Sequence, residues 1–122
     1  MTMAGKYVDG FVVPVPKKNI DAYKAFSEKA GQVWKDHGAL EYVECIADDV
    51  KPGKVTSFPQ AVKHEDDEVV VFSWIVYASR EERDRIMPAV MSDERLKDMN
   101  PKSMPFDGTR MFFGGFKVLL AM

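Results

Sequence analysis

The sequence predicts an α+β protein built on one four-stranded antiparallel sheet, and three observations lead to this class. Four segments are rich in β-branched and aromatic residues, as strands are. Two further segments repeat apolar residues at three- and four-residue steps, as helices do. Along the chain they follow the order β-α-β-β-α-β, which is the ferredoxin-like arrangement with both helices on one face. Right-handed crossovers then give the strand order fourth, first, third, second.

The segment from Lys6 to Val15, KYVDGFVVPV, predicts the first strand, because both alternating sets of its residues are mostly apolar. Asp9 interrupts this pattern and leaves two explanations open. Its carboxylate is paired to a cation or lies near the strand end, or it stands inside a pocket. Pro14 and Pro16 cannot donate backbone hydrogen bonds, so strand pairing should weaken there.

Apolar residues at helical spacing from Ile20 to His37 predict the first helix. Asn19 is suited to the N-cap, and Gly38 should end the helix in a left-handed conformation. His37 then lies in the last turn, where the helix dipole favours a cation. A capping role and a place in a ligand-binding site are both open for this histidine.

The segment from Ala39 to Ala47, ALEYVECIA, predicts the second strand, with Tyr42 and Glu44 on one face. An acid among large apolar residues lies at a sheet edge or is held by an arginine. Desolvation would raise its pKa, as general acid-base chemistry requires. Cys45 is the single cysteine and is interpreted as a reduced, buried thiol.

Residues 48–67 form the longest irregular stretch, yet Val55 to Val62 is too apolar for a free loop. We expect these residues 55–62, called the arm below, to cover a cavity or to contribute to an interface. His64 stands next to acidic residues and is expected to be solvated.

The third strand, Glu68 to Tyr77 (EVVVFSWIVY), carries the strongest strand signal, because it contains no Gly or Pro. Its residues alternate between two apolar faces, with Val70, Phe72, Trp74 and Val76 on one and Val69, Val71, Ser73, Ile75 and Tyr77 on the other. Helices cover one face of such a sheet, so the second apolar face requires a partner or a ligand.

The second helix is predicted to begin at a capping box, in which Ser79 is the N-cap and Glu82 its partner. Pro88 has no N–H to donate to the preceding turn. We therefore expect a kink or break there and a shorter helix from about Asp93.

The last strand is predicted from Thr109 to Leu120, with a bulge or a close backbone approach at Gly114-Gly115. Arg110 lies near its start. A guanidinium stays charged and binds a carboxylate through two hydrogen bonds, so Arg110 is the expected partner of a buried Asp9 or Glu44. The expected strand order makes the first and fourth strands neighbours and favours the pair of Asp9 with Arg110.

Length and composition limit the classes of protein and partner. The 122 residues, 46% of them hydrophobic, are expected to form a single domain, residues 1–122. The 17 basic and 19 acidic residues are interspersed, without the basic stripe that binds nucleic acid. No apolar run approaches the ~20 residues that span a bilayer, and the first residues lack a signal-peptide core. We expect no nucleic-acid or membrane partner and a cytoplasmic location.

Four stretches carry a resemblance to a known family: YVDGFVVPVP, VWKDHGALEYVECIADDVKPGKVTSFPQAVK, VVFSWIVYASREERD and MPFDGTRMFFGGF. They look like the YbaA-like uncharacterised bacterial proteins, a family placed in the dimeric α/β-barrel superfamily, and the likeness covers nearly the whole chain. The resemblance implies a homodimer whose two sheets enclose a barrel. It implies no mechanism, because the family has no established activity.

Three functions remain open at this stage. The first is a cofactor-independent enzyme, monooxygenase- or isomerase-like by analogy with the superfamily, acting on a small apolar or aromatic molecule. The second is a non-catalytic small-molecule-binding, stress-related or regulatory dimer, and the third is a barrel filled by its own side chains. The candidate catalytic residues are Asp9, Glu44 and Arg110, and the candidate ligand-binding residues are Tyr42, Trp74, Phe72 and His37. No cofactor or metal is expected, because the sequence has two histidines and neither a metal-spaced His/Cys cluster nor a Gly-rich phosphate loop.

Overall fold

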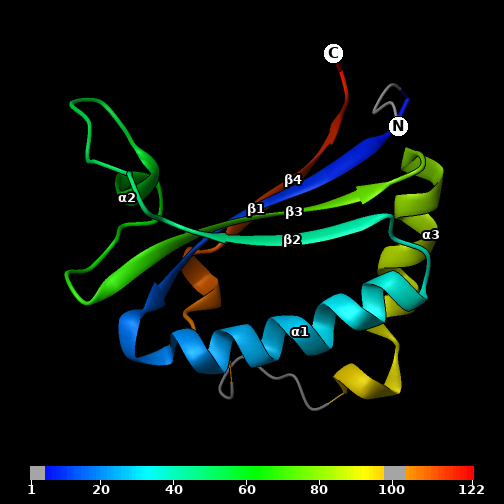
Figure 1. Cartoon of the computed structure of the whole chain (residues 1–122), viewed down its shortest axis with the longest axis horizontal. Helices are drawn as coiled ribbons and strands as arrows, with labels where there is room; N and C mark the ends of the chain where they lie inside the picture. The colour runs from blue at the N-terminus through cyan, green and yellow to red at the C-terminus, as the bar shows by residue number, and fades with distance from the viewer. Residues whose placement is uncertain (1–4, 98–103) are drawn as a thin grey trace.

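The computed structural model of the chain describes residues 5–97 and 104–122. Its four strands are β1 (Tyr7–Pro16), β2 (Glu41–Ile46), β3 (Glu68–Tyr77) and β4 (Phe112–Lys117). They form one antiparallel sheet in the order β2-β3-β1-β4, which confirms the strand order predicted from the sequence (Figure 1). The bounds of β3 are those predicted, whereas β2 and β4 are shorter than predicted.

Two long helices, α1 (Ile20–Asp36) and α3 (Arg80–Met91), pack on the same face of the sheet. In Figure 1 the sheet is seen nearly edge-on, with α1 below it and α3 beside the end of β3. The remaining helical segments are short, namely α2 (Phe58–Ala61) and the 3-10 helices η1 (Lys17–Asn19), η2 (Glu94–Leu96) and η3 (Gly108–Arg110). The predicted α+β class is confirmed.

The main core lies between the sheet and the two long helices. It joins Tyr7, Ile75 and Tyr77 of the sheet with Val33 and Trp34 of α1 and Ile86 of α3. These sheet residues all belong to one of the two alternating sets, so that set defines the helix-covered face. The other set defines what we call the open face, on which Phe72, Phe112 and Phe116 are 41%, 46% and 65% exposed.

Pairing along β1 differs between its two sides. β1 pairs with β3 as far as Pro16, but with β4 only from Tyr7 to Val12. The weakening expected at Pro14 and Pro16 is therefore wrong on the β3 side. On the other side β4 has already ended, so Pro14 meets no strand that needs its missing N–H.

The ends of the long helices follow the sequence signals in part. Gly38 has φ of +117° and lies just beyond α1, as predicted. At the start of α3, Ser79 Oγ accepts a hydrogen bond from the backbone N–H of Glu82 at 3.1 Å, as predicted. Asn19 occupies the N-cap position of α1, but its side chain donates to the carbonyl of Pro105 at 3.0 Å instead of capping the helix.

Of the kink or break expected at Pro88, a break is not found, because α3 continues through this residue to Met91. The shorter helix expected from about Asp93 is the 3-10 helix η2, for which Asp93 is the N-cap. Pro88 lies in the last turn of the helix, and its carbonyl still accepts a hydrogen bond from the backbone N–H of Ser92 at 3.0 Å. The missing N–H of Pro88 therefore removes one hydrogen bond close to the C-terminal end of α3, where its effect on the helix is small.

The Gly114-Gly115 pair lies in β4 without the bulge that was one of two expectations, because the register with β1 is uninterrupted. The alternative, a close approach, is confirmed at Gly115. A Cβ atom there would lie 2.4 Å from the hydroxyl of Tyr7, which only glycine avoids.

The arm contains α2 and packs at one end of the sheet. Its Val62 is buried against Val12 and Val70, which confirms that part of this segment is packed. Val55 is 94% exposed and Phe58 46% exposed, so the arm also presents apolar side chains to the outside. His64 is exposed, as expected, and its Nε2 also lies 2.5 Å from the carbonyl oxygen of Glu68.

Candidate functional site

The structure separates the candidate residues instead of gathering them. Phe72 and Trp74 lie on the open face, Asp9, Tyr42 and Glu44 on the helix-covered face, His37 just after α1, and Arg110 in η3. The predicted pair of Asp9 with Arg110 is wrong, because each of them binds another residue.

The open face carries an apolar groove of about 610 Å³. Gly10 and Gly114 are directly paired across β1 and β4 and form its floor. A Cβ atom on Gly10 would meet nothing within 4 Å. The groove is therefore hollow here because both residues are glycines and have no side chain. The groove is bordered by Val8, Val12, Phe72, Trp74, Phe112 and Phe116. None of the described residues that line it is ionisable.

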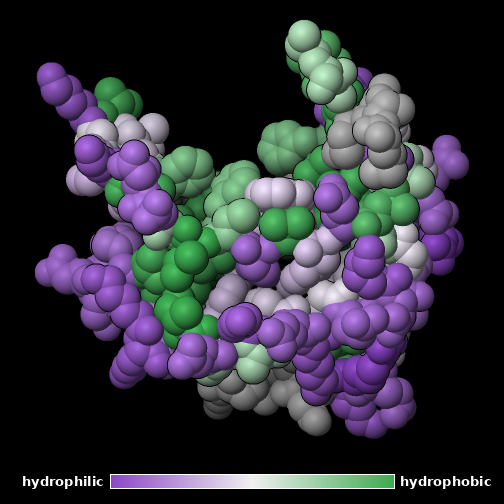
Figure 2. Space-filling view, in the orientation of Figure 1, coloured by the Kyte–Doolittle hydropathy of each residue, from purple (hydrophilic) through white to green (hydrophobic). Residues whose placement is uncertain are grey.

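Two projections rise on either side of the open face and leave a saddle between them (Figure 2). One carries the arm and the other carries the end of the chain, residues 118–122 (Figure 1). Val55 on the arm and Leu119 and Leu120 near the chain end are 94%, 98% and 75% exposed. Apolar surface of this extent is typical of a binding surface.

Asp9 is fully buried on the helix-covered face and pairs with Arg83 of α3. Its carboxylate accepts a hydrogen bond from the Tyr77 hydroxyl at 2.9 Å and another from Arg83 Nη1 at 3.2 Å. Burial raises the pKa of Asp9, although Tyr77 and Arg83 act in the opposite direction. Of the two explanations left open by the sequence, pairing to a cation is therefore correct.

The Asp9 pair extends into a network of aromatic residues. Arg83 Nη2 donates to the Tyr7 hydroxyl at 3.2 Å, and the guanidinium carbon lies 4.9 Å from the centre of the Tyr7 ring. Trp34 donates from its indole nitrogen to the Tyr77 hydroxyl at 3.0 Å. These contacts fasten α1 and α3 to the sheet and leave no surface of Asp9 for a substrate.

Glu44 lies on edge strand β2 and is held by two tyrosines. Its two carboxylate oxygens accept hydrogen bonds from the hydroxyls of Tyr23 at 2.7 Å and of Tyr42 at 3.0 Å. The edge position confirms one of the predicted alternatives, whereas an arginine partner is not found among the described residues. Burial, and then the charge of Glu44, raise the pKa of Tyr23 and of Tyr42, so both hydroxyls stay protonated.

A cleft of about 510 Å³ separates α1 from β2 and reaches these three side chains. We call it the α1–β2 cleft, and its main lining residues are Ile20, Tyr23, Ser27, Gly31, Tyr42 and Glu44. Figure 2 looks onto its mouth, where pale and green surface lies between β2 and the purple outer side of α1. The ring of Tyr42 rests on Gly31, where a Cβ atom would come within 2.7 Å of it.

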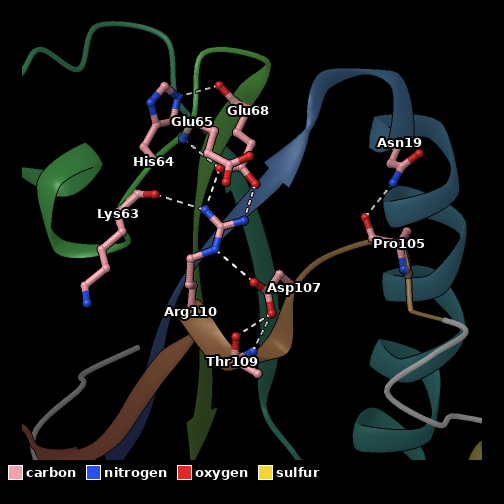
Figure 3. A network of polar contacts seen from close by, with 9 residues as sticks. All are labelled: Asn19, Lys63, His64, Glu65, Glu68, Pro105, Asp107, Thr109 and Arg110. Atoms are coloured by element: carbon pink, nitrogen blue, oxygen red, sulfur yellow. Dashed lines mark hydrogen bonds and ion pairs between the residues drawn. The ribbon is translucent and has the colours of Figure 1, made fainter.

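Arg110 binds Glu68, which is 3% exposed (Figure 3). Its two terminal nitrogens meet the two carboxylate oxygens of Glu68 at 2.7 and 2.5 Å, and its Nε donates to Asp107 at 3.0 Å. Arg110 also donates to the carbonyl of Lys63 at 3.0 Å. These bonds tie η3 to the start of β3 and to the chain that follows the arm.

His37 lies between the end of α1 and η2, and its Nε2 is 2.8 Å from a carboxylate oxygen of Asp93. Asp93 is also bound by Arg95 at 3.0 Å. These residues lie apart from the groove and are not among those that line the α1–β2 cleft. The contact joins the ends of two helical segments, in keeping with the structural role left open for His37.

Sequence reasoning missed Arg83, Tyr23, Ser27 and Glu68. All six residues from Arg80 to Arg85 (REERDR) are charged. Their spacing alone therefore does not show which arginine faces the sheet. Glu68 opens β3, a place where an exposed acid is common. Its burial depends on Arg110, which is distant in sequence.

In residues 5–97 and 104–122 no group of three or more His, Cys, Asp or Glu side chains is placed to hold a metal ion. Over the same part of the chain, no helix has both the length and the apolar character needed to cross a membrane.

The geometry defines an α+β protein whose open antiparallel sheet is covered by helices on one face and carries an apolar groove on the other. The chain belongs to the family described as "Protein of unknown function (DUF1428)", whose model matches residues 6–108. It is 54% identical over 115 residues to the "Uncharacterized protein YbaA" of Escherichia coli K12, covering 94% of this chain and 97% of that protein. The proteins of the same name from Escherichia coli O157:H7 and Shigella flexneri match equally, at 54% identity. The resemblance seen in the sequence is confirmed.

Proposed function

We propose that the open faces of two copies of this chain pack against each other and form a barrel. The groove between them then binds a small apolar or aromatic molecule without catalysing a reaction. The observation that carries the proposal is the groove over Gly10 and Gly114. Its aromatic border suits an apolar ligand. A second copy of the chain is suited to cover the groove, because a two-fold contact brings identical apolar surfaces together.

The size of the face supports a dimer that includes the two projections. Four strands spaced about 4.8 Å apart, with six residues at about 3.3 Å each, give a flat area of roughly 400 Å². A standard interface buries about 800 Å² on each partner. The arm and residues 118–122 carry exposed apolar side chains beyond those of the sheet itself. We therefore expect both projections to contact the partner.

Binding is favoured over catalysis because of where the acids lie. Asp9 and Glu44 are on the helix-covered face, and Arg110 is engaged by Glu68 and Asp107. General acid-base chemistry needs an ionisable group within reach of the reacting atoms. The described residues that border the groove offer van der Waals and aromatic contacts instead.

The dimer predicts the effect of Phe72→Lys. Phe72 is 41% exposed in one chain, so a lysine can reach water in a monomer, but between two apolar faces its charge would be buried. We expect light scattering to fall from twice the 13.8 kDa of one chain to a single 13.8 kDa, with at least about 100-fold weaker association.

The matched control is Ala22→Lys, which adds the same side chain at an exposed position of α1. It should leave the dimer intact. A wild-type protein that scatters as 13.8 kDa at micromolar concentration would contradict the dimer.

The groove predicts the effect of Gly10→Val. A valine has space at this position in one chain, so the fold should be kept while the floor of the groove rises. We expect 2-naphthol, a small aromatic probe, to bind the wild type and to bind the variant at least 10-fold more weakly. Quenching of Trp74 measures this in a Trp34→Phe background, which removes the buried tryptophan.

The oligomeric state of Gly10→Val separates a hollow barrel from a packed one. If a ligand occupies the groove, the variant remains a dimer and loses the probe. If side chains of the partner fill the groove, the valine collides with them and the dimer dissociates, which contradicts ligand binding. Native mass spectrometry of freshly purified wild type would show a co-purifying ligand.

A further inference from the structure

The α1–β2 cleft holds a negative charge that no cation neutralises within the described part of the chain. Glu44 makes no ion pair there, whereas the buried Asp9 and Glu68 and the partly buried Asp93 each have one. The two tyrosines that donate to Glu44 are neutral, because burial and the nearby carboxylate keep them protonated. They orient the carboxylate and leave its charge in place.

The carboxylate also has unused acceptor capacity. Each oxygen of Glu44 accepts one tyrosine hydroxyl, Oε2 from Tyr23 and Oε1 from Tyr42. A carboxylate offers about four acceptor positions in all, so about two remain. A group with several N–H donors could therefore bind Glu44 without displacing either tyrosine.

Ser27 lies on α1 beside the two tyrosines. Its residue is 6% exposed and lines the same cleft, and both tyrosine hydroxyls are close to its Oγ. The Oγ atom itself is closed off from solvent, so Glu44 is the group in this cluster that a ligand would meet.

The walls of the cleft determine the rest of the ligand. Ile20 and Val71 are apolar, and the rings of Tyr23 and Tyr42 flank the carboxylate. Aromatic faces attract cations within about 6 Å of the ring centre. Lys24, Glu28 and Lys35 also line the cleft, and Lys35 donates to the carbonyl of Leu40 at 2.7 Å.

We propose that the α1–β2 cleft binds a small organic cation, a primary ammonium group on a short apolar or aromatic body. The ammonium donates to Glu44, and the body lies against Tyr42 and the apolar wall. The cleft is on the opposite side of the sheet from the groove, so this site does not depend on the function proposed for the groove. Lys24 also lines the cleft.

The probe is benzylamine, and its neutral counterpart of equal shape is benzyl alcohol. We expect saturable binding of benzylamine at pH 7, at least 10-fold tighter than that of the alcohol. In ¹⁵N NMR spectra the backbone signals of Ser27 and Gly31 should move, while those of Gly10 and Gly114 should not. This comparison uses the wild-type protein alone and requires no variant to fold.

Three variants assign the binding to named residues. Glu44→Gln should weaken the binding of benzylamine at least 10-fold. Glu41→Gln, on the opposite side of β2, should change the affinity less than 2-fold. Lys24→Met should tighten binding or leave it unchanged. Equal binding of amine and alcohol, no saturation by 50 mM benzylamine, or full binding by a folded Glu44→Gln variant would each overturn the proposal.

Discussion

Replacing Arg83 by methionine should lower the free energy of unfolding by about 3–5 kcal/mol at pH 7, because it leaves a buried carboxylate without its cation. Asp9 is fully buried, and Arg83 Nη1 lies 3.2 Å from it. The Tyr77 hydroxyl still donates to Asp9 in the variant, but a neutral donor does not compensate the charge. Urea unfolding at fixed protein concentration measures the change.

The matched control is Arg80→Met on the same helix. Arg80 pairs with Asp84 at 3.5 Å, and the two side chains are 70% and 56% exposed. Exposed pairs contribute at most about 1 kcal/mol, so this variant should unfold nearly like the wild type. Equal losses in the two variants would mean that burial of Asp9 does not set the cost.

The dependence on pH follows from the pKa of Asp9. Burial raises it above the ordinary value of 3.8, so the contribution of this group to stability is complete at low pH and is lost as pH rises through the folded-state pKa. Without Arg83 the pKa should rise further. The difference between variant and wild type should therefore be largest at neutral pH and shrink on acidification toward 3.8. A difference that stays constant from pH 7 to pH 4 would contradict this account.

The sequence predicted the strands and their order well because apolar periodicity is local. β3 is covered on one face and apolar on both, and its alternating residues are visible without any structure. Which set faces the helices is a different question, because it depends on the chain geometry that brings α1 and α3 to one side. The sequence left both faces equivalent, so it could not decide whether Asp9 and Glu44 or Phe72 and Trp74 line the open face.

The partners of the charged residues were the least predictable feature. Arg110 was assigned to a strand, yet Asp107 accepts hydrogen bonds from the backbone N–H and the hydroxyl of Thr109 and folds this segment into η3. The Asp-Gly-Thr sequence before Arg110 is a local signal for such a turn. No comparable signal marks Arg83, because its contact with Asp9 depends on tertiary packing alone.

Replacing Arg110 by methionine should cost about 3–5 kcal/mol of unfolding free energy at pH 7, for the same reason as at Arg83. Glu68 is 3% exposed, and Arg110 contacts both of its oxygens. In a double-mutant cycle with Glu68→Gln, the coupling energy should be about 1–3 kcal/mol. The cycle of Asp9→Asn with Arg110→Met is the control, and it should give a coupling near zero because these residues bind different partners.

Glu68 should respond to pH in the opposite sense to Asp9. Hydrogen bonds from Arg110 hold the pKa of Glu68 below its ordinary value of 4.5, so its contribution to stability is present above that value and is lost as pH falls through the folded-state pKa. Acidification of the wild type should thus remove the contribution of Glu68 while it relieves the cost of burying Asp9. Glu68→Gln should flatten the loss of stability below about pH 4.5, whereas Asp9→Asn should not. An acid profile unchanged by Glu68→Gln would mean that this buried pair does not control acid unfolding.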